Sequence, residues 1–490
     1  MRLSEAVHGL PLFGSCGGDP EVAGVAHDSR RTTAGDVYVA IVGEHFDGRR
    51  FASEAVARGA VAVVGPQPGS EAPDVPWLDC EEPRSVLGPL ASRVYGHPDR
   101  ELVTAGVTGT NGKTTTTILL ASLHSAAGLP AGVLGTVGNR FRETVYEGGR
   151  TTPEASDLFR ILRAMRSAGA QAVAMEVSSH ALAMGRVAGV TFDAAVFTNL
   201  TRDHLDFHRD LEDYFAAKRR LFGQLKPSGK AVLNVDDPYG RRLAAEIPDA
   251  VTFGEGGSVR VLEAQLAMDG TRARLATPRG ELTVWTPLLG RFNLANALAA
   301  VAAAEALGLS HEAIAHGLAH QRPVPGRMEP VDRGQPFAVF VDFAHTDDGL
   351  RAALSSLREL VGPAGRVAVV FGCGGDRDPG KRPKMGRVAG ELADRVIVTS
   401  DNPRGEDPQA ILAAVEAGLK EGGFGQYTVI ADRRAAIRAA LAEAGPGWAV
   451  LLAGKGHERQ QLVGGQQLAF SDVEEAARAL EERHGSPVGR

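Results

Sequence analysis

The sequence predicts an α/β protein of three domains: a small N-terminal α/β domain, a central P-loop-type α/β domain with a mostly parallel sheet, and a C-terminal Rossmann-like α/β domain. The chain has 490 residues, which is about three domains of ordinary size. Short β-branched runs alternate with Ala- and Leu-rich helical segments. A strand, a glycine turn and a helix follow one another from residue 102. We place the domains at residues 1–97, 98–325 and 326–490.

Composition narrows the class of protein. Hydrophobic residues make up 43% and charged residues 23% of the chain, as in ordinary globular proteins. A net charge of −6 argues against bulk electrostatic binding of nucleic acid. The cysteines Cys16, Cys80 and Cys373 are too far apart for a metal-ligand pair, which suits a reducing cytoplasm. No apolar run reaches the roughly 18 residues of a membrane span. We therefore expect a cytoplasmic protein with no nucleic-acid partner and no membrane span.

The N-terminal domain is predicted from two strands, at residues 37–42 and 60–64, with a helix at 52–58 between them. Polar clusters at residues 27–30 and 44–49 follow strands, where binding residues are common. Composition alone favours the alternative that both clusters are ordinary turn residues with surface charge.

The central domain opens on the segment that organises the chain. A β-branched strand at 102–107 leads into a turn from Gly109 to Gly112, and a helix begins at Lys113. Free backbone N–H groups and the helix dipole favour an anion at such a turn. Lys113 can neutralise phosphate charge, and the Thr114 hydroxyl can coordinate Mg²⁺. Val107 stands where the full Walker pattern has glycine, so an ordinary strand–helix turn is the alternative.

Further polar residues follow the other central strands. Glu176 ends a strand at 172–177, and residues 199–208, rich in Asp and His, follow a strand at 194–198. Ligands of open α/β sheets bind at such carboxyl ends. Lys218 lies on one face of a helix at 214–222, pointing either to solvent or into the site. Apolar and polar residues alternate over residues 259–286, as in antiparallel strands. An Ala-rich helix follows this segment.

The C-terminal domain is predicted as a parallel sheet with strands at 337–342, 366–371, 395–399, 427–430 and 448–452. Polar clusters follow four of them, at 342–346, 372–378, 401–404 and 454–458. Because all four clusters would meet at one edge of the sheet and carry both positive and negative side chains, this edge is suited to bind a zwitterion. Arg404 or Arg377 can bind a carboxylate, and Glu458 or Asp401 can accept from an ammonium.

These residues together resemble the Mur ligase family of bacterial cell-wall synthesis, and most closely its MurE type. The matching segments are residues 108–115, 175–180, 197–206, 292–296, 325–329 and 401–404. The chain departs from the expected pattern at Arg150, Met184, Phe343 and Arg459.

The resemblance implies an ATP-dependent ligase that uses Mg²⁺. It would join meso-diaminopimelate to the D-Glu γ-carboxylate of UDP-MurNAc-L-Ala-D-Glu through an acyl phosphate, in peptidoglycan precursor synthesis. We expect it to act as a monomer. The alternatives are a ligase for L-lysine or L-ornithine, another Mur ligase, folylpolyglutamate synthase, and an ATP-regulated switch protein without ligase activity.

The resemblance also implies site residues. The catalytic residues would be Lys113, Glu176, His204 and Lys218. Those that bind ATP would be Gly109, Thr110, Asn111, Gly112, Lys113, Thr114, Thr115, Asn296, Arg327 and Asp342. Those that bind the UDP-linked substrate would be Ser29, Glu44, His45, Phe46, Thr151, Thr152, Ser178 and Arg186. Those that bind the amino acid would be Arg377, Asp401, Asn402, Pro403, Arg404, Gly454 and Glu458. Thr114 and Glu176 would hold one Mg²⁺, and Glu176, His204 and a CO₂-carbamylated Lys218 a second.

Overall fold

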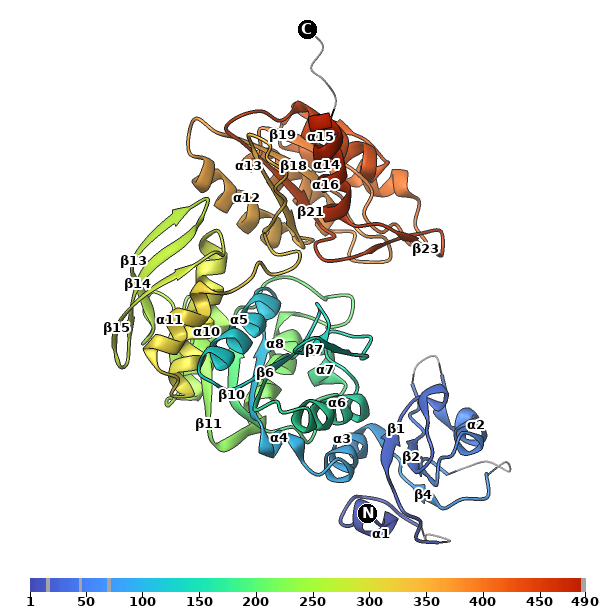
Figure 1. Ribbon diagram of the computed structural model, residues 1–490. Helices are drawn as coiled ribbons and strands as arrows, with labels where there is room; N and C mark the ends of the chain where they lie inside the picture. Colours follow the sequence, from blue (N-terminus) through green and yellow to red (C-terminus); the bar gives the residue numbers. More distant parts are fainter. Residues whose placement is uncertain (15–17, 44–45, 68–71, 486–490) are drawn as a thin grey trace.

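Three bodies, each with its own main sheet, follow one another along the chain in the computed structural model (Figure 1). The structure describes residues 1–14, 18–43, 46–67 and 72–485. The central body lies between the other two, and the N-terminal body is on the opposite side of it from the C-terminal body (Figure 1). The α/β class and the three-part organisation expected from the sequence are confirmed. Within the described residues, no helix has both the length and the apolar character to cross a membrane.

The N-terminal body is a four-stranded parallel sheet in the order β1-β2-β3-β4. Its strands are β1 (Gly24–Ala26), β2 (Asp36–Val39), β3 (Ala62–Gly65) and β4 (Trp77–Asp79). Its helices are α1 (Leu3–Val7), η1 (Ser29–Arg31), η2 (Gly48–Phe51), α2 (Ala52–Ala57) and α3 (Pro83–Val94). The strands predicted at 37–42 and 60–64 correspond to β2 and β3. The sequence analysis missed β1 and β4, because three-residue strands carry almost no periodic signal.

The central body contains an eight-stranded sheet in the order β12-β11-β10-β5-β9-β6-β7-β8. Its strands are β5 (Val103–Thr108), β6 (Ala131–Leu134), β7 (Asn139–Phe141), β8 (Thr144–Tyr146), β9 (Ala172–Glu176), β10 (Phe192–Phe197), β11 (Leu225–Asn234) and β12 (Val251–Phe253). Its helices are α4 (Pro98–Glu101), α5 (Lys113–Ala126), α6 (Ala155–Ser167), α7 (Ser179–Ala183), α8 (Leu211–Arg219), η3 (Arg220–Gln224) and α9 (Pro238–Glu246). All pairings are parallel except those of β7. The middle strands are buried on both faces, which is why they read as continuous apolar runs.

A second sheet of the central body, β13 (Arg260–Ala267), β14 (Gly270–Thr277) and β15 (Gly280–Thr286), is antiparallel. β13 and β14 are joined by a two-residue turn, Met268-Asp269, after which Gly270 begins β14. Helices α10 (Arg291–Ala306) and α11 (His311–Ala319) follow it. Most residues of α10 are buried, and their small alanine side chains let this helix pack closely against α5.

The C-terminal body has a six-stranded sheet in the order β16-β17-β21-β18-β19-β20, parallel except for β16. Its strands are β16 (Glu329–Pro330), β17 (Ala338–Asp342), β18 (Arg366–Phe371), β19 (Arg395–Val398), β20 (Tyr427–Val429) and β21 (Trp448–Ala453). A separate hairpin pairs β22 (Gln460–Val463) with β23 (Gln466–Ala469). The helices are α12 (Asp347–Val361), α13 (Lys381–Leu392), α14 (Pro408–Glu421), α15 (Arg433–Glu443) and α16 (Asp472–Gly485). The five predicted strands are all present; β16 and the hairpin were not predicted.

Candidate functional site

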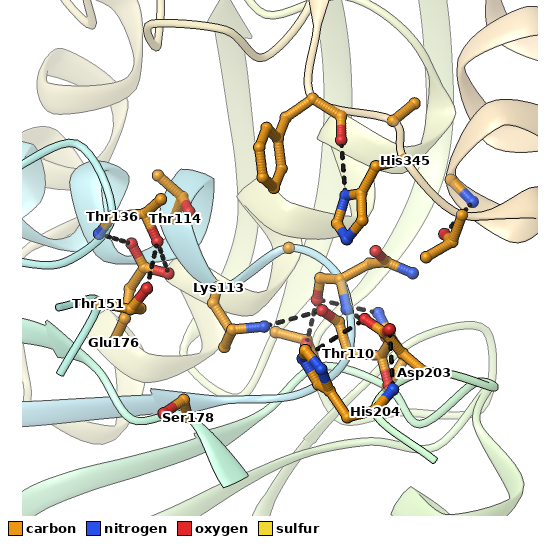
Figure 2. A pocket seen from close by; sticks show the side chains of 18 of the residues that line it. Thr110, Lys113, Thr114, Thr136, Thr151, Glu176, Ser178, Asp203, His204 and His345 are labelled. Carbon is orange, nitrogen blue, oxygen red and sulfur yellow. Dashed lines mark hydrogen bonds and ion pairs between the residues drawn. The ribbon is translucent and has the colours of Figure 1, made fainter. Parts of the chain in front are cut away.

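A cavity of about 690 Å³ lies between the carboxyl ends of the central and C-terminal sheets. It brings together most of the predicted site residues. Those that line it are Thr110, Asn111, Gly112, Lys113, Thr114, Thr115, Thr151, Thr152, Glu176, Ser178, Arg186, His204, Lys218, Asn296, Arg327, Asp342, Arg377, Asp401, Asn402, Arg404, Gly454 and Glu458. Gly109 and Pro403 lie just outside this lining. Figure 2 shows the central part of the cavity, with the Lys113 side chain between Glu176 on one side and the Asp203–His204 pair on the other.

The turn between β5 and α5 is shaped as an anion cradle. Gly112 has φ +87° and stands at the start of α5, and a Cβ atom there would collide with the side-chain oxygen of Asn296. Gly109 has φ +153°, and a Cβ there would collide with the Thr198 hydroxyl. Only glycine therefore fits both positions. The Lys113 ammonium donates to the carbonyls of Gly109 (2.9 Å) and Thr110 (2.8 Å), so it is held over the turn.

Glu176 ends β9 with its carboxylate directed into the cavity. It accepts from the backbone N–H of Thr136 (2.7 Å) and from the Thr136 hydroxyl (3.1 Å), while the Thr114 hydroxyl accepts from Arg327 (3.0 Å). The sequence analysis missed Thr136, which follows β6. It reaches Glu176 only because β6 pairs with β9, a contact between segments 40 residues apart.

These oxygens fit Mg²⁺ in chemistry and in number. A hydroxyl and a carboxylate are hard oxygen donors, which Mg²⁺ prefers, and Mg²⁺ usually keeps waters and substrate phosphates as its other ligands. In the described part of the chain, no three His, Cys, Asp or Glu side chains gather as a metal cage. An ion here would therefore be held by Thr114 and Glu176 together with a bound phosphate.

Lys218 points into the site, which decides between the two orientations that its helix allowed. Its side chain is 1% exposed, its ammonium donates to the Gly109 carbonyl (2.7 Å), and it lies 4.4 Å from the centre of the Tyr214 ring. Burial lowers the pKa of Lys218 well below its usual value, and the nearby Lys113 lowers it further. This environment favours the neutral amine.

His204 lies on the same side of the cavity, in a left-handed conformation (φ +54°). Its Nε2 is 3.5 Å from Asp203, and its ring packs edge-on against His180, with centroids 4.8 Å apart. Burial is the main cause that lowers the pKa of His204, with Lys113, His180 and Lys218 acting in the same direction. The imidazole is therefore neutral at pH 7, the form that can bind a metal.

The predicted contacts to the UDP-linked substrate divide into two groups. Thr152 links Glu176 to Ser178, because its hydroxyl donates to the Glu176 carbonyl (2.9 Å) and accepts from the Ser178 N–H (3.1 Å). Arg186 donates to Glu154 at 2.9 Å. The second group is in the N-terminal body, away from the cavity. There the Ser29 hydroxyl donates to Glu54 (2.9 Å), and Phe46 is 73% exposed. The predicted Glu44 and His45 lie outside the described residues.

The C-terminal wall carries the predicted amino-acid contacts. Arg404 has φ +52° and donates to the Gly375 carbonyl (2.7 Å), so one edge of its guanidinium is fixed and the rest faces the cavity. Asn402 donates to Glu458 (2.8 Å), and one carboxylate oxygen of Asp401 is buried without a hydrogen-bond partner. The carboxylates of Asp401 and Glu458 line the same cavity as the guanidinium groups of Arg377 and Arg404, so the cavity offers complementary partners for a zwitterion.

Comparison with known proteins places this geometry in a family. A protein of Gloeobacter violaceus named UDP-N-acetylmuramoyl-L-alanyl-D-glutamate--2,6-diaminopimelate ligase is 48% identical over 488 residues, 99% of each chain. The chain belongs to the Mur ligase family. A protein of the same name from Geobacter metallireducens is 45% identical over 94% of both chains.

Family models and solved structures agree with this membership. The models "Mur ligase family, catalytic domain", "Mur ligase middle domain" and "Mur ligase, glutamate ligase domain" match residues 21–95, 107–304 and 326–456 of the chain. A solved UDP-N-acetylmuramoyl-L-alanyl-D-glutamate--2,6-diaminopimelate ligase superposes with a TM-score of 0.70 at 34% identity, over 99% of this chain and 100% of the other. A MurF ligase of Thermotoga maritima shares the fold, with a TM-score of 0.67 at 21% identity.

Proposed function

We propose that the chain is an ATP-dependent amide ligase of the MurE type, which joins meso-diaminopimelate to the D-Glu γ-carboxylate of UDP-MurNAc-L-Ala-D-Glu. One observation carries the proposal. A phosphate cradle with Lys113 and Glu176 faces the Asp401, Arg404 and Glu458 pocket across a single cavity. Two relatives at 45% and 48% identity over nearly full length bear the name of that ligase.

The reaction has two steps. The γ-carboxylate attacks the γ-phosphorus of ATP, the bond to the bridging oxygen breaks, and ADP leaves, so that an acyl phosphate forms. The neutral amine of the amino acid then attacks the acyl carbon, phosphate leaves, and a proton is lost from nitrogen. Lys113 and the N–H groups at the start of α5 stabilise the negative charge of the transferred group. Mg²⁺ held at Thr114 and Glu176 would offset further phosphate charge.

The three bodies divide the work. We infer that residues 1–97 hold the uridine end of the substrate, residues 98–325 the ATP, and residues 326–490 the amino acid. We propose that the protein acts in the cytoplasm, because a nucleotide-linked precursor and ATP are both cytoplasmic metabolites, and that it acts as a monomer.

The identity of the amino acid follows from the arginines. Arg404 and Arg377 face the cavity, and a lysine or ornithine substrate would leave them without a distal carboxylate to bind. Because two guanidinium groups directed at one cavity are matched best by two carboxylates, we infer that the substrate has two carboxylates. This argument favours meso-diaminopimelate over L-lysine and L-ornithine.

The test measures ADP release by the purified protein with Mg·ATP and UDP-MurNAc-L-Ala-D-Glu. We expect release that depends on meso-diaminopimelate, with L-lysine and L-ornithine at least about 100-fold less effective in kcat/KM, as expected when a site loses a charged partner. Release with lysine alone would assign the alternative substrate. ATP binding without any amino-acid-dependent release would favour the switch protein. The control is the same mixture without UDP-MurNAc-L-Ala-D-Glu.

A further inference from the structure

The strongest unassigned feature is a lysine buried behind the amino-acid pocket. Lys455 is 0% exposed, although it stands in the loop between β21 and β22. Its neighbours Gly454 and Glu458 line the cavity, whereas Lys455 is not part of the lining among the described residues. A buried ammonium away from the ligand space must be held by other groups of the protein.

Those other groups are the predicted amino-acid contacts themselves. The Lys455 ammonium donates to the side-chain oxygen of Asn402 (2.9 Å) and to Glu458 (3.0 Å), and it lies 3.6 Å from Asp401. Two of its contacts are hydrogen bonds, and the third, to Asp401, is an ion pair without a hydrogen bond. Lys455 therefore connects two separate loops of the pocket, those after β19 and β21.

These contacts fix the orientation of the side chains in front. The Asn402 oxygen accepts both from Lys455 and from the backbone N–H of Leu462 (3.0 Å), so the amide cannot turn around without losing two bonds. Its NH₂ group then points to Glu458, to which it donates at 2.8 Å. Glu458 is 32% exposed at the side chain and would otherwise rotate into solvent.

The ionisable side chains around Lys455 do not balance one another in charge. Asp401 and Glu458 carry two negative charges and Lys455 one positive charge. Behind them, Arg433 and Asp472 form an ion pair that is 0% exposed on both sides (2.6 Å) and adds no net charge. These five side chains sum to one negative charge, which a single ammonium would neutralise, and Arg404 and Arg377 on the same cavity remain for the substrate carboxylates. Without Lys455, the two carboxylates would repel each other or share a proton, and a proton would compete with that ammonium.

We propose that Lys455 is a positioning residue for the incoming amino acid: it holds Asn402 and Glu458 so that Glu458 and Asp401 accept the distal ammonium of the diamino acid. The inference rests on the proposed function. It adds a recognition role for the substrate amine that does not react, and it places that role on a residue that does not touch the substrate.

The experiment compares the wild type with Lys455→Met using two substrates. One is meso-diaminopimelate, and the other is L-2-aminopimelate, which has the same chain and both carboxylates but lacks the distal amine. We expect the KM for meso-diaminopimelate to rise about 30-fold or more, as when a buried charge-assisted contact is broken. The KM for ATP should stay within about twofold, because the phosphate cradle is in another body.

The deciding readout is the ratio of kcat/KM for the two substrates. In Lys455→Met the preference for meso-diaminopimelate should fall about tenfold or more, since L-2-aminopimelate has no distal amine to lose. A residue that only stabilises the fold would lower both values alike and leave the ratio unchanged, which would overturn the inference. If wild-type protein shows no release of ADP with either amino acid, the proposed function fails instead.

Two further variants complete the design. Lys420→Met is the matched control, because Lys420 forms an exposed pair with Glu416 on α14 (3.0 Å), and it should leave both KM values and their ratio unchanged. Lys455→Gln keeps a donor in the buried position and is the variant to use if Lys455→Met does not fold, as judged by thermal unfolding. Because glutamine lacks the positive charge that pairs with Glu458, a fall in the substrate ratio is still expected, and an unchanged ratio in this variant also overturns the inference.

Discussion

The surroundings of Lys218 change its chemistry at the scale of a single residue. The side chain is buried beside the Gly109 carbonyl, and burial followed by the charge of Lys113 lowers its pKa. A lowered lysine pKa increases the neutral fraction at neutral pH, and only the neutral amine reacts with CO₂ to form a carbamate. That product would replace a cation with an anion on the side of the cavity where His204 lies.

We expect Lys218→Ala to lower kcat by at least about 100-fold, because it removes a charged group from the site of phosphoryl transfer. Short carboxylic acids such as acetate or propionate should restore part of the activity by occupying the space of the lost carbamate. The measurement is ADP release with and without the acid. Lys230→Ala, on the exposed part of β11, is the control and should match the wild type. Full activity of Lys218→Ala would remove the carbamate from the mechanism.

The helix α5 has a glycine at each end, and only the glycine at its N-terminal end shapes the phosphate cradle. Gly112 begins the helix with φ +87° and Gly128 follows its last turn with φ +79°, so both are in the left-handed region. A Cβ at Gly128 would meet nothing within 4 Å, whereas one at Gly112 would collide with Asn296. The backbone strain of an alanine is thus similar at the two ends, and only the N-terminal end also loses space at the phosphate cradle.

We therefore expect Gly112→Ala to raise the KM for ATP about 30-fold or more, because the cradle would be displaced from the phosphates. Gly128→Ala should cost about 1 kcal/mol of stability from its conformation alone and leave the KM for ATP unchanged. Steady-state kinetics and urea unfolding of both variants give the two numbers. Equal KM values in the two variants would show that the cradle does not hold the nucleotide.

The sequence predicted elements whose signals are local and missed those that depend on distant pairing. The β5–turn–α5 unit and the five main C-terminal strands were predicted because apolar runs and glycine turns lie within short windows. The last two strands at one side of the central sheet, β7 and β8, and the β22–β23 hairpin are short or polar, so nothing in their own residues distinguishes them from loops.

The same limit applies to the site. Lys113, Glu176 and Arg404 stand in recognisable motifs, and the structure places all three on one cavity. Thr136 and Lys455 act through hydrogen bonds to residues 40 and 53 positions away, and neither position has a local pattern that points to these distant partners, although Lys455 also bonds the nearby Glu458. Lys218 lies between these cases, because its helix face was predictable but the direction in which that face points was not.

The whole molecule must bring the phosphate cradle and the amino-acid pocket together while excluding water. Across the cavity, Arg202 of the central body pairs with Asp378 of the C-terminal body (3.2 Å). Farther out, Arg291 pairs with Glu359 at 2.6 Å. These are exposed ion pairs, which contribute little and can exchange with water. An acyl phosphate is hydrolysed by water, so the cavity has to close while that intermediate exists.

We expect the two bodies to approach each other when a non-hydrolysable ATP analogue and UDP-MurNAc-L-Ala-D-Glu bind together, because ligands held from both sides favour the closed arrangement. Small-angle X-ray scattering should show a decrease in the radius of gyration with both ligands. Asp378→Arg places two cations opposite each other across the cavity, and it should reduce that decrease. Glu421→Arg makes the same charge change opposite Arg387, within the C-terminal body (2.8 Å in the wild type), and should leave it intact. A radius that does not respond to the ligands in the wild type would mean that the acyl phosphate is shielded by the substrates themselves and not by movement of the bodies.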